Sequence, residues 1–234
     1  MILQSLTKTL GQSVYNQIKT AIINSEFRPG QRLYEKEMAR IFDVSITPVR
    51  EAFLRLQADE YITIDSHRKA AVKPITLQEM KEIFEVLANL DAMAAGLVVN
   101  IIDSEHILEI ENLLDRMEKA SKPCFATDYL SLSMEMQHKI WESLPNKILW
   151  KALHFAYDQL LRYNYVLYIA FQDPEILRKS FEEHVNIVQT LKNKDKQRLP
   201  QLVKIHWNQA IQNLQLKNKN RHAFGANTDS DAGL

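Results

Sequence analysis

The C-terminal two thirds of the chain repeat the apolar spacing of an α-helix six times, and this pattern constrains the fold more than any other feature of the sequence. Apolar side chains recur every three or four positions, and capping or breaking signals such as Asp103-Ser104 and Asp173-Pro174 separate the stretches. The six stretches cover residues 77–100, 104–121, 125–143, 146–170, 174–193 and 196–216. Long amphipathic helices with short connections favour an antiparallel bundle. We therefore predict a mainly α protein with a six-helix bundle over residues 76–216, followed by a flexible tail over residues 217–234.

Residues 1–75 show a different pattern, in which three helical stretches precede two short strands. The first helix is predicted over residues 12–24, before the turn signal Arg28-Pro29-Gly30. A second covers residues 35–42, and only Asp43-Val44 separate it from a third, which is typical of a helix-turn-helix. The segments YITID and AAVKPI then indicate two strands around a polar tip. These features predict a winged helix-turn-helix domain over residues 1–75.

The third helix begins within the stretch DVSITPVREAF. Ser45 or Thr47 can accept a backbone N–H bond as the N-cap, and Pro48 is tolerated in a first turn. Arg50 stands within one turn of that start, off the apolar stripe that continues through Phe53 and Leu56. The helix start alone does not explain why an arginine stands in this place.

Composition excludes several classes of protein. The single cysteine, Cys124, excludes an internal disulfide framework and any multi-cysteine metal site, and it fits a reducing compartment. No apolar run approaches the roughly 18 residues of a membrane span, and the first residues lack a signal-peptide pattern. We therefore expect a cytoplasmic protein without a membrane segment.

Charge is distributed unevenly along the chain. The 29 basic and 29 acidic residues balance overall, but residues 1–75 hold 11 Lys and Arg against 8 Asp and Glu. This small basic excess favours phosphate contact by the N-terminal domain.

The segment RPGQRLYEKEMARIFDVSITPVREAFLRLQADEYI resembles the winged helix-turn-helix of the GntR family of bacterial transcription regulators. The resemblance implies that the third helix enters the major groove of double-stranded operator DNA and that the wing tip lies near the minor groove. It implies DNA contacts by six residues: Lys36, Ser45, Thr47, Arg50, His67 and Arg68. Among these, it places Arg50 where the guanidinium can form a bidentate contact with guanine. Two alternatives remain open: Thr47 serves only as a helix cap, and Arg50 pairs with an acidic neighbour on its own helix.

The chain departs from the family pattern at Ile46, where an arginine is usual. An isoleucine cannot donate a hydrogen bond and can at most touch a thymine methyl group. We therefore expect an operator that differs from the family's usual guanine-bearing core.

Three histidines fall on apolar stripes of the predicted bundle. They are His138, His184 and His206, each on a different helix. One such histidine is usually a satisfied core residue, but facing helices can bring three imidazoles to the roughly 2 Å nitrogen–metal distance of a zinc-like ion. The combination favours a metal site.

The contexts MQHKIWESLPN, FEEHVNIVQTL and VKIHWNQAI resemble the histidine motifs of the FCD ligand-binding domain of the FadR subfamily within GntR, and six helices resemble its VanR-like branch. This resemblance implies a divalent metal, zinc or nickel, on His138, His184 and His206, with a small organic acid bound on or near it. The site lacks the usual aspartate, because Met134 takes its place and methionine is a poor ligand for a hard ion. Met134 and Arg162 are the candidate effector-binding residues. Arg162 would bind the acid group, with a solvated helix arginine as the alternative.

Together these observations predict a ligand-responsive repressor or activator that binds a pseudo-palindromic operator as a homodimer. Two alternatives stay open. One is a metal-dependent hydrolase that uses the histidine cluster, and the other is a helical interaction module without specific DNA binding.

Overall fold

The computed structural model describes residues 2–220, while residue 1 and residues 221–234 lie outside the described part. Of the predicted flexible tail, residues 217–220 belong to the last helix and the rest falls outside the described residues. The chain separates into two compact units. One consists of residues up to 76 together with residues 161–165, and the other of residues 77–160 and those from 166 onward. Every helix in the described part is too short or too polar to cross a membrane.

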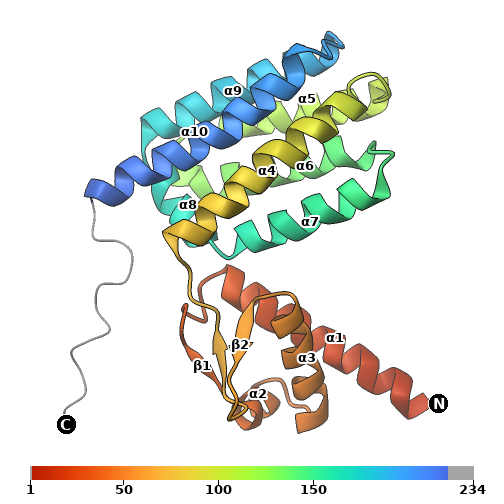
Figure 1. Ribbon diagram of the computed structural model, residues 1–234, viewed down its shortest axis with the longest axis vertical. Helices are drawn as coiled ribbons and strands as arrows, with labels where there is room; N and C mark the ends of the chain where they lie inside the picture. The colour runs from red at the N-terminus through yellow and green to blue at the C-terminus, as the bar shows by residue number, and fades with distance from the viewer. Residues whose placement is uncertain (1, 221–234) are drawn as a thin grey trace. The chain divides into compact units, whose positions relative to one another are not determined.

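The first unit has the element order of a winged helix-turn-helix (Figure 1). Its elements are α1 (Ile2–Ile23), β1 (Arg32–Leu33), α2 (Glu35–Ile41), α3 (Ile46–Ala58), β2 (Ile62–Ile64) and β3 (Ala70–Val72). The strands form an antiparallel sheet in the order β1-β3-β2, in which Ala70 lies opposite both Leu33 and Ile64. The apolar stripe of α3 packs into the core of this unit, where Val49, Phe53 and Leu56 are buried.

The connection between α2 and α3 is short because one residue takes a left-handed conformation. Asp43 has a φ of 51°, and the N–H of Val44 donates to the carbonyl oxygen of Ala39 at 3.0 Å. Such a bond satisfies one of the last carbonyl groups of α2. The chain can therefore reverse direction and begin α3 within four residues.

The wing tip between β2 and β3 is fixed by one aspartate. Asp65 Oδ1 accepts hydrogen bonds from the backbone N–H groups of His67 and Lys69, both at 2.8 Å. Arg68, between them, has a φ of 59°, a conformation that L-residues adopt at a cost. The tip therefore holds a defined shape and leaves the His67 and Arg68 side chains exposed.

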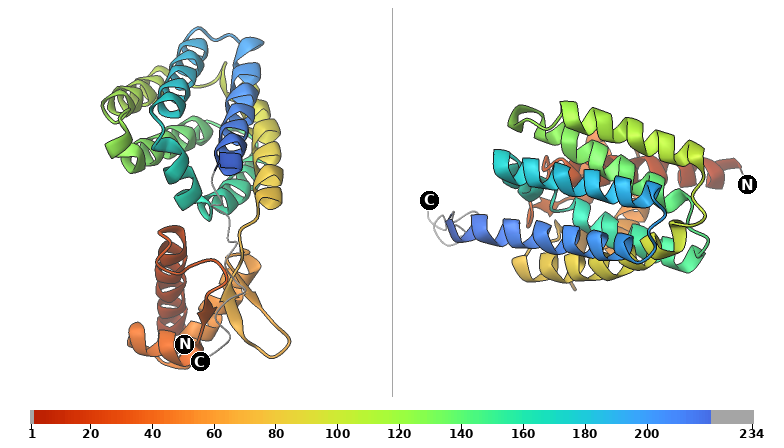
Figure 2. Two further views of the ribbon diagram at one scale, coloured as in Figure 1. Left: turned by 90° about the vertical axis from the view of Figure 1, so that its left-hand side faces the viewer. Right: turned by 90° about the horizontal axis from the view of Figure 1, so that it is seen from above.

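The second unit consists of helices. They are α4 (Leu77–Val98), α5 (Ser104–Lys119), the short 3₁₀ helix η1 (Pro123–Phe125), α6 (Ala126–Glu142), α7 (Lys147–Leu161), α8 (Asn164–Phe171), α9 (Pro174–Lys192) and α10 (Arg198–Asn220). Helix α10 lies between α4 and α9, and α5 packs against α6 and α9 (Figure 2). The bundle has one more α-helix within the described residues than the sequence analysis predicts, because the stretch 146–170 is divided into α7 and α8 at Arg162 and Tyr163.

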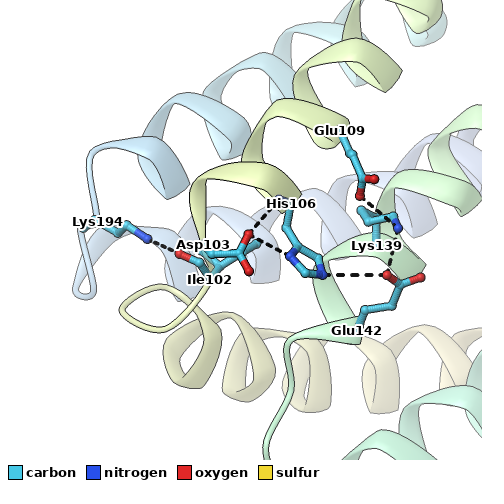
Figure 3. Close-up of polar contacts among 7 residues, drawn as sticks. All are labelled: Ile102, Asp103, His106, Glu109, Lys139, Glu142 and Lys194. Carbon is cyan, nitrogen blue, oxygen red and sulfur yellow. Dashed lines mark hydrogen bonds and ion pairs between the residues drawn. The ribbon is translucent and has the colours of Figure 1, made fainter.

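Exposed polar contacts join α5 to α6 at one end of the bundle (Figure 3). Asp103 caps α5 by accepting from the His106 N–H at 2.9 Å, and its Oδ1 also lies 2.8 Å from the ring Nδ1 of His106. Lys139 on α6 pairs with Glu109 on α5 at 3.0 Å and with Glu142 at 2.8 Å. Exposed ion pairs contribute little stability. We therefore infer that these polar contacts fix the register of α5 against α6, while the packing of their apolar faces holds the two helices together.

Candidate DNA-binding surface and ligand pocket

All six side chains that the sequence analysis assigns to DNA contact are exposed. They lie on three neighbouring segments of the first unit: Lys36 on α2, Ser45, Thr47 and Arg50 at the start of α3, and His67 and Arg68 at the wing tip. Exposed basic and hydroxyl side chains at the start of the second helix of a helix-turn-helix are the groups that contact bases and phosphates in such domains.

The start of α3 differs in one respect from the prediction. Ser45 occupies the N-cap position, yet its side chain makes no capping hydrogen bond, and Thr47 is already the second helical residue. The proposed capping bond is therefore absent at Ser45, and Thr47 does not serve as the cap. Ile46, between them, is 39% exposed. The first turn thus presents two hydroxyl groups and one apolar side chain outward.

Arg50 pairs with an acidic residue, but not with one on its own helix. Its Nε and Nη2 donate to the two carboxylate oxygens of Glu35 on α2, at 3.1 and 2.8 Å. This bond raises the pKa of Arg50, and it lowers the pKa of Glu35, to which the charge of Arg68 also contributes. The Arg50 side chain stays 60% exposed, so the pair contributes little to stability and leaves the guanidinium accessible.

The helical unit contains a cavity of about 70 Å³ with mainly apolar walls. Its lining includes Phe84 from α4, Leu130, Ser133 and Met134 from α6, Tyr157 from α7, Phe171 from α8, Ser180, Glu183 and His184 from α9, and His206 and Trp207 from α10. The walls combine apolar side chains with a few convergent polar groups, as ligand sites do, but the cavity is smaller than the roughly 300 Å³ of common ligand pockets.

His184 anchors the polar end of this cavity. The ring Nδ1 lies 2.7 Å from the carbonyl oxygen of Ser180 and therefore carries the proton, which leaves Nε2 to accept from the Ser133 hydroxyl at 3.0 Å. The Tyr129 hydroxyl extends the network to the Ser180 hydroxyl at 3.1 Å. Burial, with a smaller contribution from His206, lowers the pKa of His184 to about 3, so this imidazole is neutral.

His206 stands beside His184, with 4.5 Å between the ring centroids. Its Nδ1 lies 2.6 Å from a carboxylate oxygen of Glu183, and both side chains are mostly buried. The structure therefore brings two of the three predicted histidines together, each with its Nδ1 held by an oxygen of α9.

His138 is not part of this cluster. Its ring packs against His154 at 5.1 Å, Tyr157 at 5.2 Å and Trp141 at 5.4 Å, and burial lowers its pKa. No group of three or more His, Cys, Asp or Glu side chains in the described residues is arranged to hold a metal ion. The donor set expected from the sequence thus does not fit a three-histidine site.

The two predicted effector residues have different positions. Met134 lines the cavity, as expected. Arg162 does not, because it lies between α7 and α8, where its Nη2 donates to the carbonyl oxygen of Pro74 at 3.1 Å and the residue is 5% exposed. It is therefore neither a solvated helix arginine nor part of the cavity wall.

Asp91 on α4 is a buried carboxylate that is not among the candidate residues predicted from the sequence. Its oxygens accept from the indole N–H groups of Trp141 at 2.7 Å and Trp207 at 2.8 Å, and from the Gln137 amide at 2.8 Å. Burial raises the pKa of Asp91 to about 6, although these indole bonds oppose the shift. The sequence feature that could have indicated Asp91 is its position within an apolar helical stripe. Its neighbours on that stripe, Leu87, Ala88 and Ala95, are also buried, and a carboxylate among them needs hydrogen-bond partners.

The cavity wall also contains polar residues that were not predicted from the sequence, among them Ser133, Ser180, Glu183 and Asn213. Glu183 directly precedes His184, which lies on the apolar stripe of its helix. This neighbourhood was the only feature of the sequence that could have indicated Glu183 as a cavity residue.

Comparison with known proteins agrees with this architecture. A family described as "Bacterial regulatory proteins, gntR family" matches residues 10–72, and the FCD domain matches residues 82–209. The chain is 27% identical over 201 residues to the uncharacterized HTH-type transcriptional regulator YdhC of Bacillus subtilis (strain 168), covering 86% of this chain and 88% of that protein. It is 25% identical over 189 residues to the HTH-type transcriptional regulator McbR of Escherichia coli (strain K12), covering 81% and 85%.

The solved structure of E. coli McbR/YncC has the same fold, with a TM-score of 0.73 at 24% identity over 89% of this chain and 98% of that one. Both matching families, and the relatives named above, are transcription regulators rather than enzymes. The chain therefore belongs to the GntR family of bacterial transcription regulators, with an FCD domain after its DNA-binding domain.

Proposed function

We propose that this regulator reads its operator through the start of α3 and the wing tip, as a homodimer, under the control of a small organic acid in the cavity of the helical unit. The observation that carries the proposal is the exposure of Arg50, Thr47 and Arg68 on adjacent segments of the winged helix. Bacterial operators lie in the cytoplasm, which is where we place the protein.

The DNA-binding part of the proposal is tested by binding-site selection followed by a salt titration. We expect one enriched pseudo-palindromic duplex, bound more tightly than a scrambled duplex of the same composition at every salt concentration. Equal affinity for the two duplexes would instead favour the helical interaction module.

Dimerisation is supported by an apolar stripe on α4. Val86, Met93 and Leu97 are 46%, 54% and 39% exposed, and their spacing of seven and four residues places them on one helical face. An exposed apolar stripe of this kind marks an interaction surface. Two copies related by a two-fold axis can cover each other's stripe, and the same axis would present two reading helices to two operator half-sites.

The cavity favours a small effector whose polar group faces Ser133, His184 and His206. Among the described residues of its wall are the Glu183 carboxylate and two imidazoles, but no Lys or Arg. An acid in this cavity would therefore be bound through hydrogen bonds from side chains such as Ser133 and His206 rather than through an ion pair with Lys or Arg.

The effector is tested by fluorescence anisotropy on the selected operator, with a series of carboxylic acids of two to six carbons and their amides. We expect at least one acid to change operator affinity, its amide to act more weakly, and Ser133→Val to weaken the response. A series in which amides and acids act alike would show that the carboxylate is not what the cavity recognises.

A zinc or nickel ion remains a prediction of the family resemblance, and no step of the proposal depends on it. His184 and His206 are the two imidazoles that would hold it, since His138 faces the aromatic cluster instead. Elemental analysis of untagged protein, with thermal melts before and after chelation, tests the prediction. A stoichiometric metal and a lowered melting temperature on chelation would support it, and an unchanged melt without metal would remove it.

A further inference from the structure

The Arg50–Glu35 pair has a geometry that bears on how bases are read. A guanidinium carries five N–H groups in one plane, and Glu35 accepts from the side edge, formed by Nε and Nη2. The end edge, formed by Nη1 and the outer N–H of Nη2, lies outside this pair. Guanine presents its O6 and N7 acceptors in the major groove at a spacing that matches such an edge. Glu35 and a guanine can therefore be bound by the same guanidinium at once.

Glu35 also limits how far the Arg50 side chain can move. An arginine that is 60% exposed has many rotamers, and fixing one of them on DNA carries an entropic cost. The bidentate bond to a carboxylate on the neighbouring helix α2 fixes the plane and direction of the guanidinium before DNA arrives. A carboxylate beside the guanidinium also competes with any backbone phosphate for it.

We infer that Glu35 is a specificity-determining positioning residue, which holds the Arg50 guanidinium by its side edge so that the end edge reads a base instead of pairing with phosphate. This inference rests on the proposed base contact of Arg50. Glu35 is exposed in part, at 31% of its side chain, and contributes one negative charge to a surface that approaches DNA.

A simple surface charge and a positioning residue predict different changes in the ratio between selected and scrambled duplex affinities when the negative charge of Glu35 is removed. As a simple surface charge, Glu35 repels phosphates, so Glu35→Gln should tighten binding to every duplex by a similar factor. As a positioning residue, Glu35 restrains Arg50, so Glu35→Gln should reduce the ratio between selected and scrambled duplex affinities. Gln keeps the length of the side chain and one acceptor oxygen but loses the bidentate carboxylate.

The experiment measures the affinity of four proteins for the selected duplex and for the same duplex scrambled, at two salt concentrations. The proteins are the unchanged chain, Glu35→Gln, Arg50→Ala and the matched control Glu37→Gln, which removes an exposed acidic residue from the same first turn of α2. Circular dichroism melts verify that each variant is folded. Discrimination is the ratio of the two affinities.

We expect Glu35→Gln to bind scrambled DNA about twofold more tightly than the unchanged chain does. We expect its discrimination to fall about fivefold to tenfold, which is a large part of the discrimination that one bidentate base contact provides. Glu37→Gln should show the gain in affinity without the loss of discrimination. If Glu35→Gln behaves like Glu37→Gln, or discriminates better than the unchanged chain, the inference is wrong while the base contact stands. If Arg50→Ala keeps full discrimination, the base contact itself is wrong, and the inference with it.

Discussion

At the scale of single residues, Arg50 and Arg68 have different expected roles although both are exposed arginines of the winged helix. Arg50 stands at the start of the reading helix in a fixed orientation, whereas Arg68 stands at the wing tip, where phosphates and the minor groove are nearest in such domains. Their substitutions should therefore differ in kind as well as in size.

Arg50→Ala should weaken binding to the selected operator by about 1 to 3 kcal/mol and relax the preference at one base pair. Arg68→Ala should weaken all duplexes alike and reduce the slope of log affinity against log salt by about 1. Anisotropy titrations at several salt concentrations measure both quantities. Equal and sequence-independent losses for the two variants would contradict the base contact of Arg50.

Asp91 predicts a pH dependence of stability that can be assigned to one group. Its folded-state pKa of about 6 lies above the value of 3.8 for an ordinary aspartate, so the folded chain holds this proton more tightly than the unfolded chain. The protonated Asp91 therefore stabilises the folded state by about 3 kcal/mol relative to the ionised form. This contribution is fully present below about pH 4 and is lost as pH rises through about 6. Ionised Asp91 is thus a cost at neutral pH.

Asp91→Asn removes the titration and keeps one acceptor oxygen for the indole groups. The difference in unfolding free energy between the unchanged chain and this variant should shift in favour of the variant between pH 4 and pH 7. Urea unfolding at fixed protein concentration measures it, with the exposed Asp128→Asn as control. A difference that stays constant with pH would show that Asp91 does not titrate in this range.

At the scale of elements, the wing tip depends on a single side chain. Asp65→Ala removes the acceptor for the N–H groups of His67 and Lys69, and each lost hydrogen bond is worth about 1 kcal/mol. We expect faster amide exchange at both residues and weaker DNA binding, with β2 and β3 still paired. Ser66→Ala at the same tip is the control. Unchanged exchange at His67 and Lys69 would show that the backbone alone holds the tip.

Helices α2 and α3 of the first unit could be predicted from the sequence because their signals are local, whereas α1 begins at Ile2 instead of the predicted residue 12 and β1 is not among the predicted strands. The stripe through Val49, Phe53 and Leu56 marks the buried face of α3, and Asp43-Val44 mark the turn before it. The break between α7 and α8 could not be predicted, since neither Pro nor Gly interrupts LLRYNYVL and apolar residues continue on both sides.

The histidine cluster shows a second limit of the sequence. An apolar stripe indicates that a side chain faces the core, but the rotation of each helix about its axis determines which side chains it contacts there. His184 and His206 face each other across α9 and α10, whereas His138 on α6 faces His154 on α7. This outcome depends on packing between distant segments, which periodicity does not encode.

At the scale of the whole molecule, the α4 stripe predicts that the proposed dimer can be separated into folded monomers by a single substitution. Leu97→Lys should shift the protein from dimer to monomer in sedimentation equilibrium, because it places a charge on an apolar face that a second copy would bury. Operator affinity should fall with it, since one chain holds only one half-site. Leu108→Lys, an exposed leucine on α5, is the matched control. A dimer that survives Leu97→Lys would place the interface elsewhere.

Arg162 and Tyr163 have a consequence for anyone who exchanges modules between regulators. Tyr163 is fully buried, and its hydroxyl group donates to the carbonyl oxygen of Thr76 at 3.2 Å and lies 3.4 Å from the Thr76 N–H, while Arg162 holds the carbonyl oxygen of Pro74. Both residues come from the middle of the helical sequence but belong to the first compact unit. A chimera cut at residue 76 therefore separates the winged helix from residues 161–165, which belong to the same compact unit. A functional hybrid should take residues 161–165 from the same parent protein as its winged helix.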